Sequence, residues 1–257
     1  MKRIIRGIEN FGISPVRIVK SVVTLPWFYR SKRDFIRKST KNDFPFAQDY
    51  LCLNDRYDKS GTLSGQYFHM DLHVAQRIFL NQPIKHVDVG SNIQGFVAHV
   101  ASYREIEIFD IRPNESNVKN ISFRQADFSN PVSLPEGYTD SLSCLHAIEH
   151  FGLGRYGDSI DPDGHLKGLD NMYKLIKPGG KFYFATPIGP QRIEFNAHRV
   201  FSLKYLMNLF NGKYRIEQFS YVDDRGDLYT DLTITDAVIN SNCNCRYGCG
   251  IFEMVKI

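Results

Sequence analysis

Two aspartates and a glycine stand at regular places in the middle of the chain, each at the end of a short apolar run. Gly90 follows the first run, Asp110 closes the second run 20 residues later, and Asp127 follows the third. A glycine after a strand lets the backbone approach a ligand closely, and a carboxylate at the end of the next strand can accept both hydroxyls of a ribose. The spacing predicts a nucleoside-type ligand, with Asp110 on its ribose and Asp127 on its adenine amino group.

The turn between the first apolar run and the following helix reads DVGSNIQG, residues 88–95. The free N–H groups at the start of that helix can bind a carboxylate or a phosphate. A dinucleotide fingerprint places glycines at positions 90, 92 and 95, and Asn92 stands where the second glycine lets the backbone reach a pyrophosphate. The turn therefore disfavours a nicotinamide cofactor. The residues predicted to bind a cofactor are Asp88, Gly90, Ser91, Asn92, Gly95, Asp110, Ile111, Asp127, Phe128 and His146.

Short strands and helices alternate around these residues. The predicted strands are residues 85–89, 105–109, 121–124, 141–146 and 181–185, and the predicted helices are residues 67–80, 96–103 and 166–176. This order predicts an α/β fold, with a Rossmann-like, doubly wound and mostly parallel sheet covered by helices on both faces. Ligands of such sheets bind outside the carboxyl ends of the strands, where the glycine and the two aspartates are placed.

Three further segments complete a known pattern. They read, in chain order, CLHAIEHF (144–151), LDNMYKLIKPGG (169–180) and HRVFS (198–202). Together with the Asp-x-Gly turn and the aspartates after the second and third strands, they resemble class I methyltransferases over about residues 66–257. The resemblance implies S-adenosylmethionine as the cofactor. It also implies a C-terminal antiparallel strand in a final hairpin, for which residues 214–222 and 249–256 are available.

A narrower resemblance is to the uncharacterised methyltransferase-like family called domain of unknown function 268. It rests on VDVGSNIQGFVAHVAS (87–102), FDIRP (109–113) and HAIEHFGLGRYGD (146–158). Methyltransferase turns usually run Asp-x-Gly-x-Gly-x-Gly, whereas Asn92 and Gln94 replace two of those glycines here. Asparagine tolerates left-handed backbone geometry. We therefore expect a methyltransferase, with two alternatives: a non-catalytic binding module with an altered turn, and a nucleotide-sugar or NAD enzyme of Rossmann type.

Three titratable residues follow the fourth strand, beside the methyl position that the resemblance implies. His146 and His150 would share one face of a helix, four residues apart, with Glu149 between them. Because an oxygen acceptor benefits from a base, we predict His150 as that base and Glu149 as a second catalytic residue, while His146 lines the cofactor. The expected acceptor is a glycan, a lipid-linked precursor or a small molecule.

Two clusters have the residue types of metal ligands. Residues 158–165 (DSIDPDGH) place three aspartates and a histidine in one loop, which could hold a divalent cation. A solvated loop, long enough to be a substrate lid, is the simpler interpretation. Cys243, Cys245 and Cys249 have a C-x-C-x3-C spacing that matches none of the common zinc patterns. No metal site is predicted from either cluster.

Positive charge is concentrated at the start of the chain. Residues 1–42 carry eleven Lys and Arg against Glu9 and Asp34, although the net charge of the whole chain is only +4. The rest of the chain is mildly acidic. This asymmetry divides the sequence into a basic arm, residues 1–42, and a methyltransferase-like domain, residues 43–257.

The arm is predicted to form one or two basic amphipathic helices in residues 1–40, broken near residues 12–15 and at Pro26. Its Trp-Phe-Tyr triplet lies among cations, a combination that suits a membrane interface. Residues 1–38 are therefore expected to make peripheral contact with an anionic membrane. The alternative is a helix packed on the domain with a solvated basic face. Nucleic acid is not an expected partner, because the basic residues are confined to the arm and no recognition module is visible.

Cysteine usage and hydropathy indicate the compartment. Five cysteines in 257 residues do not indicate a disulfide scaffold. No signal peptide is recognisable, and no apolar run is long enough to span a bilayer. We expect a cytoplasmic protein, peripheral at the inner face of the membrane.

Overall fold

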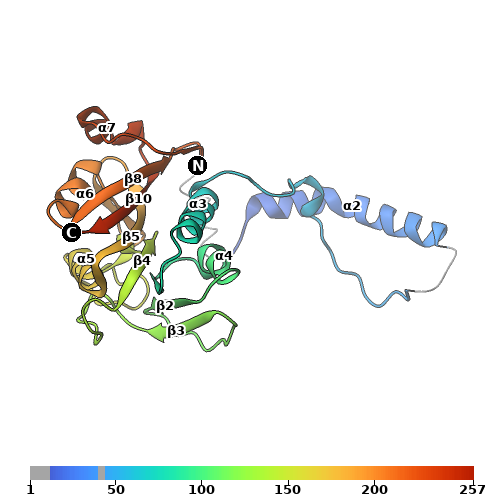
Figure 1. The fold of residues 1–257 in the computed structure, drawn as a ribbon. Coiled ribbons are helices and arrows are strands. Elements are labelled where there is room, and N and C mark those ends of the chain that lie inside the picture. The colour runs from blue at the N-terminus through green and yellow to red at the C-terminus, as the bar shows by residue number, and fades with distance from the viewer. Residues whose placement is uncertain (1–11, 40–43) are drawn as a thin grey trace. The chain divides into compact units, whose positions relative to one another are not determined.

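The computed structural model describes residues 12–39 and 44–257, and the chain divides into two compact units, Met1–Thr62 and Leu63–Ile257 (Figure 1). The helical pattern expected in residues 1–11 lies outside the described residues. The functional division predicted after residue 42 stays a prediction.

The first unit contains one long helix, α2, which runs from Pro15 to Lys38 without interruption. The predicted break at Pro26 is therefore wrong. A proline inside a helix removes a single N–H donor, which would otherwise bind the carbonyl four residues earlier. That carbonyl belongs to Val22, which is exposed, so water can take the place of the missing donor.

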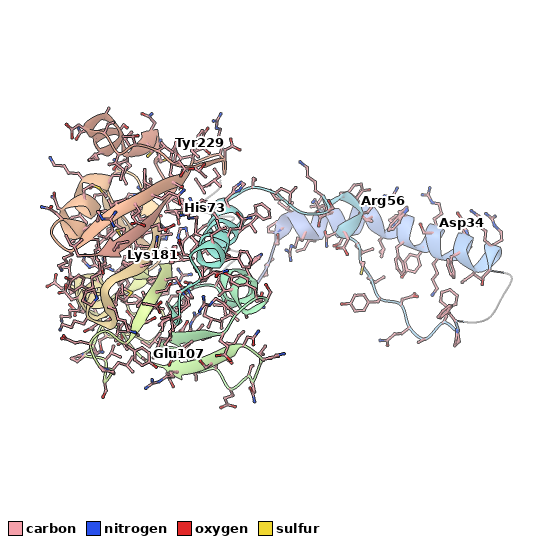
Figure 2. All side chains as sticks on the ribbon, viewed as in Figure 1. Asp34, Arg56, His73, Glu107, Lys181 and Tyr229 are labelled. Carbon is pink, nitrogen blue, oxygen red and sulfur yellow. The ribbon has the colours of Figure 1, made fainter. Side chains whose placement is uncertain are left out.

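One side of α2 is covered by the segment that follows it. Lys32 Nζ lies 2.6 Å from Asp49 Oδ1. The guanidinium of Arg56, which is labelled in Figure 2, lies 4.3 Å from the ring centre of Trp27. Thr24 is the one described residue of the helix that is buried. None of the helices in the described ranges is long and apolar enough to cross a membrane.

The second unit is an α/β domain. Its helices are α3 Gln66–Asn81, α4 Ala98–Ala101, α5 Gly164–Leu175, α6 Leu203–Phe210 and α7 Asp236–Ser241. Its strands are β1 His86–Val89, β2 Ile106–Asp110, β3 Ile121–Gln125, β4 Thr139–Leu145, β5 Ile176–Ile188, β6 Arg192–Glu194, β7 His198–Val200, β8 Tyr214–Val222, β9 Leu228–Tyr229 and β10 Gly248–Lys256.

Eight of these strands form one sheet, in the order β3-β2-β1-β4-β5-β10-β8-β9. The first five strands in that order are parallel, and β10 is antiparallel to both β5 and β8. The predicted Rossmann-like, doubly wound sheet with a C-terminal antiparallel strand is confirmed. The chain leaves β1 toward β2 on one side and later returns to β4 on the other, so the strand order reverses between β1 and β4.

Helices cover both faces of this sheet (Figure 1). Phe182 and Phe184 of β5 pack in the cluster that includes α5 and α6, whereas Tyr183 and Ala185 pack in the cluster that includes α3 and α4. This alternation follows from the two-residue period of a strand. Each fully buried large apolar side chain stabilises the fold by roughly 1.5–3 kcal/mol. The rigid sheet holds the ends of β1, β2, β3 and β4 in place.

Candidate functional site

Two adjoining pockets open at the carboxyl ends of β1 to β4. The first reaches between the ends of β1, β2 and β3. The second extends over the turn after β1. The residues that line both pockets are Gly90, Asp110, Arg112, His146, His150 and Tyr156. The edge of the sheet at which a ligand was predicted therefore carries one continuous hollow.

The turn after β1 is fixed by a buried carboxylate beneath it. Asp88 accepts hydrogen bonds from the Ser91 hydroxyl at 2.6 Å, from the Ser91 N–H at 3.0 Å and from the Ser143 hydroxyl at 2.5 Å. Burial raises the pKa of Asp88 to about 6, although the serine hydrogen bonds oppose the shift. Asp88 lines neither pocket, so its role in this structure is to shape the turn. Ser91 lines the second pocket.

Gly90 is the residue of this turn that needs to be glycine. Its φ is +73°, and a Cβ atom on it would lie 3.0 Å from the Cβ of Ala147. Any side chain would be strained by the backbone and would crowd the pocket wall.

Asn92 fits the turn without left-handed backbone geometry. The expectation from the sequence that asparagine replaces glycine here because it tolerates that geometry is wrong. Its φ is −67°, and its side chain accepts a hydrogen bond from the N–H of Gln94 at 3.1 Å. A π-helical turn, Ile93–Val97, follows and leads into α4. Both Asn92 and Gln94 line the second pocket. Because neither residue has a positive φ, the two missing glycines do not distort this turn.

Gly95 lies in the π-helical turn and lines neither pocket. A Cβ atom there would collide with the carboxylate of Asp71, a buried residue of α3. The predicted role of Gly95 in binding a cofactor stays a prediction, but its lack of a side chain serves this close approach. Burial raises the pKa of Asp71 to about 7, and its Oδ1 has no hydrogen-bond partner among the described residues.

Asp110 lies at the end of β2 and is bound by a neighbouring arginine. The Nε of Arg112 lies 2.9 Å from Oδ1, and its Nη2 lies 2.6 Å from Oδ2. The guanidinium also stacks over the ring of Tyr156, with its Cζ 4.6 Å from the ring centre. Ile111, between the two, lines the first pocket. Arg112 thus links the loop after β2 to the loop after β4.

Asp127 and Phe128 follow β3 and form another wall of the first pocket. Asp127 accepts hydrogen bonds from the N–H of Ser129 at 2.8 Å and from the side-chain amide of Asn130 at 2.7 Å. Phe128 is buried against Phe109, with ring centres 5.6 Å apart. The pocket therefore offers a carboxylate beside a flat apolar surface, which suits an aromatic base carrying an amino group.

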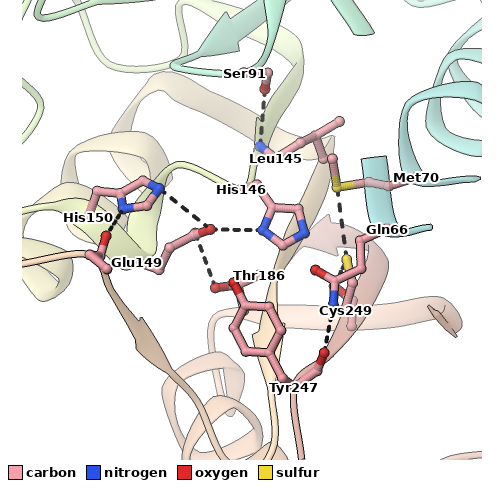
Figure 3. A network of polar contacts seen from close by, with 12 residues as sticks. Gln66, Met70, Ser91, Leu145, His146, Glu149, His150, Thr186, Tyr247 and Cys249 are labelled. Atoms are coloured by element: carbon pink, nitrogen blue, oxygen red, sulfur yellow. Dashed lines mark hydrogen bonds and ion pairs between the residues drawn. The ribbon is translucent and has the colours of Figure 1, made fainter. Parts of the chain in front are cut away.

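His146, Glu149 and His150 meet at the end of β4 (Figure 3). They do not share a helix: His146 has φ +50°, and Ile148–His150 is a single 3₁₀ turn. The i and i+4 relationship predicted for the histidines is therefore wrong. A turn takes the place of the expected helix, and this turn puts Glu149 between the rings of His146 and His150.

Glu149 is buried and joins the two histidines. Its Oε1 lies 2.8 Å from His146 Nδ1 and 3.9 Å from His150 Nε2. Burial would raise the pKa of Glu149, but the two histidines outweigh burial and lower it. For His146, burial lowers the pKa, whereas Cys249 and Glu149 raise it, and the net direction is well upward. His146 Nδ1 and Glu149 Oε1 thus form a buried hydrogen-bonded pair, and Glu149 lines neither pocket.

His150 lines both pockets and has its Nδ1 tied to the backbone. Nδ1 lies 2.6 Å from the carbonyl oxygen of Ala197. Because a carbonyl only accepts, Nδ1 carries the proton, and the neutral ring leaves Nε2 free to take another. Burial lowers the pKa of His150 below its usual value, which Glu149 partly offsets. The ring is therefore neutral near pH 7.

Comparison with known proteins assigns the chain to a family. The model of DUF268, described as a Caenorhabditis protein of unknown function, matches residues 86–244. The chain belongs to this family. No curated protein matches its sequence.

Solved structures resemble this DUF268 protein at low sequence identity. One is the 1,6-didemethyltoxoflavin-N1-methyltransferase of Burkholderia thailandensis with bound 1,6-didemethyltoxoflavin and S-adenosylhomocysteine. It is 13% identical over 73% of this chain and 78% of that chain, with a TM-score of 0.52. Another is the 4+2-cyclase SpnF, 13% identical over 81% of this chain and 84% of that chain, with a TM-score of 0.50. The DUF268 protein thus has the class I methyltransferase fold.

Neither candidate metal cluster gathers metal ligands in this DUF268 structure. Among residues 12–39 and 44–257, no group of three or more His, Cys, Asp or Glu could hold a metal ion. Asp158 accepts hydrogen bonds from the N–H groups of Gly154 and Tyr156, so it shapes its own loop. Burial raises the pKa of Cys243 and of Cys245 to about 12, which keeps both as thiols.

Sequence reasoning missed two aromatic residues and an arginine of this DUF268 site. Arg112 lies in the FDIRP segment, two residues after Asp110, and this position next to a predicted site residue could have identified it. Tyr156 comes from the loop after β4, and Tyr67 of α3 places its ring 5.0 Å from that of His146. Tyr67 carried no sequence signal, because only the packing of α3 on the sheet brings it to the second pocket.

Proposed function

We propose that this chain is an S-adenosylmethionine-dependent methyltransferase that acts on an oxygen acceptor. One observation carries the proposal: Asp110 and Asp127 line the same pocket, at the strand ends beside Gly90 with its φ of +73°. A carboxylate after β2 suits a ribose, and a carboxylate beside the buried face of Phe128 suits an adenine.

The residues present fit this cofactor. Gly90 leaves space where a Cβ atom would crowd Ala147, and Asp110, Asp127 and Phe128 offer polar and apolar surfaces to a nucleoside. When bound, S-adenosylmethionine supplies an activated methyl group. The second pocket, beside His150, is large enough to accommodate an acceptor as well.

His150 is the proposed base. Its Nδ1–H is held by the Ala197 carbonyl, so Nε2 is the atom that takes a proton from an acceptor hydroxyl. Glu149 Oε1, 3.9 Å from Nε2, stabilises the imidazolium that results. Glu149 does not touch the pocket, so we propose it as a positioning residue. The acceptor is a glycan, a lipid-linked precursor or a small molecule that bears a hydroxyl.

The fold alone does not decide the reaction, since SpnF is described as a cyclase. A non-catalytic module loses its main support, because Asn92 adopts φ −67° and needs no glycine. A nicotinamide enzyme is disfavoured because Asn92 stands where the backbone would have to approach a pyrophosphate.

Methyl transfer from radiolabelled S-adenosylmethionine to hydroxylated sugars, lipid-linked sugars and small hydroxy acids tests the reaction. The proposal expects label in an acceptor, released by ether cleavage and lost in His150→Gln. A protein that binds S-adenosylhomocysteine but labels none of these acceptors would contradict it and favour a binding module.

The arm is proposed to bind an anionic membrane surface. Ile18, Val19, Val22 and Val23 of α2 are each 54% or more exposed. These residues lie on one side of the helix, and three of the arginines in its second half, Arg30, Arg33 and Arg37, lie further along the same side. A helix that exposes valines and isoleucines beside cations suits the lipid interface of the inner face of a membrane.

Flotation with phosphatidylcholine vesicles, with and without phosphatidylserine, tests this contact. We expect binding that needs phosphatidylserine, weakens with salt, and is lost in Val22→Asp. Ser31→Asp, which adds the same charge on the opposite side of the helix, is the matched control and should retain binding. No binding to either vesicle, or equal loss in both variants, would overturn the membrane contact.

A further inference from the structure

The proposed base has a cation as its neighbour. Arg155 Nη1 donates to the carbonyl oxygen of Ala197 at 3.0 Å, the same oxygen that accepts from His150 Nδ1 at 2.6 Å. Arg155 Nη1 lies 3.5 Å from His150 Nδ1. One carbonyl therefore holds the guanidinium and the imidazole side by side, so the position of the charge relative to the base is fixed.

An aromatic ring holds the guanidinium on another side. Arg155 Cζ lies 5.0 Å from the ring centre of Tyr156, and that ring meets the ring of His150 at 90° with centres 5.4 Å apart. Tyr156 and His150 both line the two pockets, whereas Arg155 itself lines neither and lies beside these two residues. Stacking on a ring and donation to a carbonyl order an exposed arginine that would otherwise move freely.

Arg155 has no carboxylate partner in the part of the chain that the structure describes. The other arginine on the same ring, Arg112, is bound by both oxygens of Asp110. Arg192 is likewise paired with a carboxylate, that of Glu194, at 2.9 Å. Because the guanidinium of Arg155 donates to a backbone carbonyl and not to a carboxylate of the described residues, it keeps further donors for a ligand.

We propose that the acceptor carries an anionic group, a carboxylate or a phosphate, close to the hydroxyl that is methylated, and that Arg155 binds this group. The proposal rests on the proposed function, because it takes the hydroxyl to lie at His150. A guanidinium binds the oxygens of carboxylates and phosphates through parallel N–H donors. Sugar acids, hydroxy acids and sugar phosphates are therefore the acceptor class, and neutral glycans are excluded.

Inorganic phosphate is the probe for the anion site, since it requires no turnover. Phosphate is titrated into the full chain saturated with S-adenosylhomocysteine, and the ring resonances of His150 are followed by NMR. We expect a saturable shift of the His150 signals in the wild type. In Arg155→Gln, which keeps an N–H donor for Ala197 but loses the charge, the apparent Kd for phosphate should rise about tenfold or more.

Arg225→Gln is the matched control, because Arg225 is an exposed arginine paired with Asp223 on the turn between β8 and β9. Its phosphate titration should equal that of the wild type. The inference is overturned if the wild type shows no saturable shift, if phosphate acts only as an adventitious ion with equal effect in Arg155→Gln, or if Arg225→Gln weakens it equally.

Failure of this inference and failure of the proposed function give different results. If S-adenosylhomocysteine binds but phosphate does not, the methyltransferase remains and the anionic acceptor is wrong. If S-adenosylhomocysteine does not bind, the proposed function fails, and an Arg155-dependent phosphate shift in the unliganded protein would then mark an anion site that is not an acceptor site, which also overturns the inference.

Discussion

Both carboxylate oxygens of Asp110 accept hydrogen bonds from Arg112, with Nη2 of the arginine 2.6 Å from Oδ2 and Nε 2.9 Å from Oδ1. Asp110 is also the carboxylate proposed to accept the ribose hydroxyls. In the proposed complex the arginine and the ribose compete for the same oxygens, so displacing Arg112 lowers the net binding free energy of the nucleoside.

Replacing Arg112 is expected to improve cofactor binding. In Arg112→Gln the competing ion pair is lost, and since partly exposed pairs contribute up to about 1 kcal/mol, the Kd for S-adenosylhomocysteine should fall roughly two- to fivefold. Isothermal titration measures this directly. A weaker affinity would show instead that Arg112 holds the ligand rather than competing with it.

Alanine variants of Gly90 and of a control glycine distinguish the effect of backbone strain from the effect of crowding in the pocket. Gly90→Ala should destabilise the protein by about 1–2 kcal/mol through its left-handed backbone, with a further cost from the contact with Ala147, and should abolish nucleoside binding. Gly179→Ala is the control, because Gly179 has φ +75° but nothing within 4 Å of the added Cβ. Urea unfolding should show a loss in both variants, whereas titration should show lost binding only in Gly90→Ala. Unchanged binding in Gly90→Ala would place the ligand elsewhere.

The sheet and its ligand edge were predictable because strands and helices alternate with clear apolar runs. Asp110, Asp127 and Gly90 could be placed at one edge from their positions after those runs alone. The arrangement of His146 and Glu149 could not be predicted, because a turn with φ +50° at His146 replaces the expected helix. Such a turn depends on contacts with β5 and β10 that lie far away in the sequence.

Asp71 likewise could not be predicted from sequence. An aspartate in an amphipathic helix ordinarily faces solvent, but Asp71 is buried because α3 packs over the π-helical turn at Gly95. Pro26 is a case in which a local sequence signal gave the wrong prediction. Proline predicts a break, but the helix continues through Pro26.

Burial of Asp71 should make stability fall as pH rises. Its pKa is raised to about 7 in the folded protein, whereas an unfolded aspartate titrates near 3.9. Between these values the native state binds more protons than the unfolded state, so the free energy of unfolding decreases with increasing pH and the loss is complete above about pH 7.

The isosteric Asp71→Asn variant removes this dependence. Relative to the wild type, it should gain at least about 1 kcal/mol in stability between pH 4 and pH 8, as measured by urea unfolding at each pH. Asp88, whose pKa is also raised, is present in both proteins and cancels in the difference. A constant difference across this pH range would show that the Asp71 carboxylate titrates normally.

Burial and the neighbouring Glu149 have opposite effects on the protonation of the proposed base. Burial lowers the pKa of His150, and Glu149 raises it in part. NMR titration of the His150 ring should therefore give a pKa below 6.5, and Glu149→Gln should lower that pKa further. A merely structural role for Glu149 would leave the His150 pKa unmoved.

The same pKa sets the acid side of the activity profile. Protonated His150 cannot accept a proton, so methyl transfer should decline as pH falls through the His150 pKa, below 6.5. In His150→Gln this decline should be absent and the rate should be lower by about 100-fold or more. An acid limb that persists in His150→Gln would assign the base to another residue.

Binding of S-adenosylhomocysteine tests the central claim most directly. Isothermal titration of the wild type should give a Kd in the micromolar range, with no heat from NAD or UDP. Asp110→Ala should abolish binding, whereas Asp170→Ala, which removes an exposed aspartate paired with Lys213, should leave it unchanged. No heat from S-adenosylhomocysteine with a folded wild-type protein, or equal affinity in Asp110→Ala, would contradict the account.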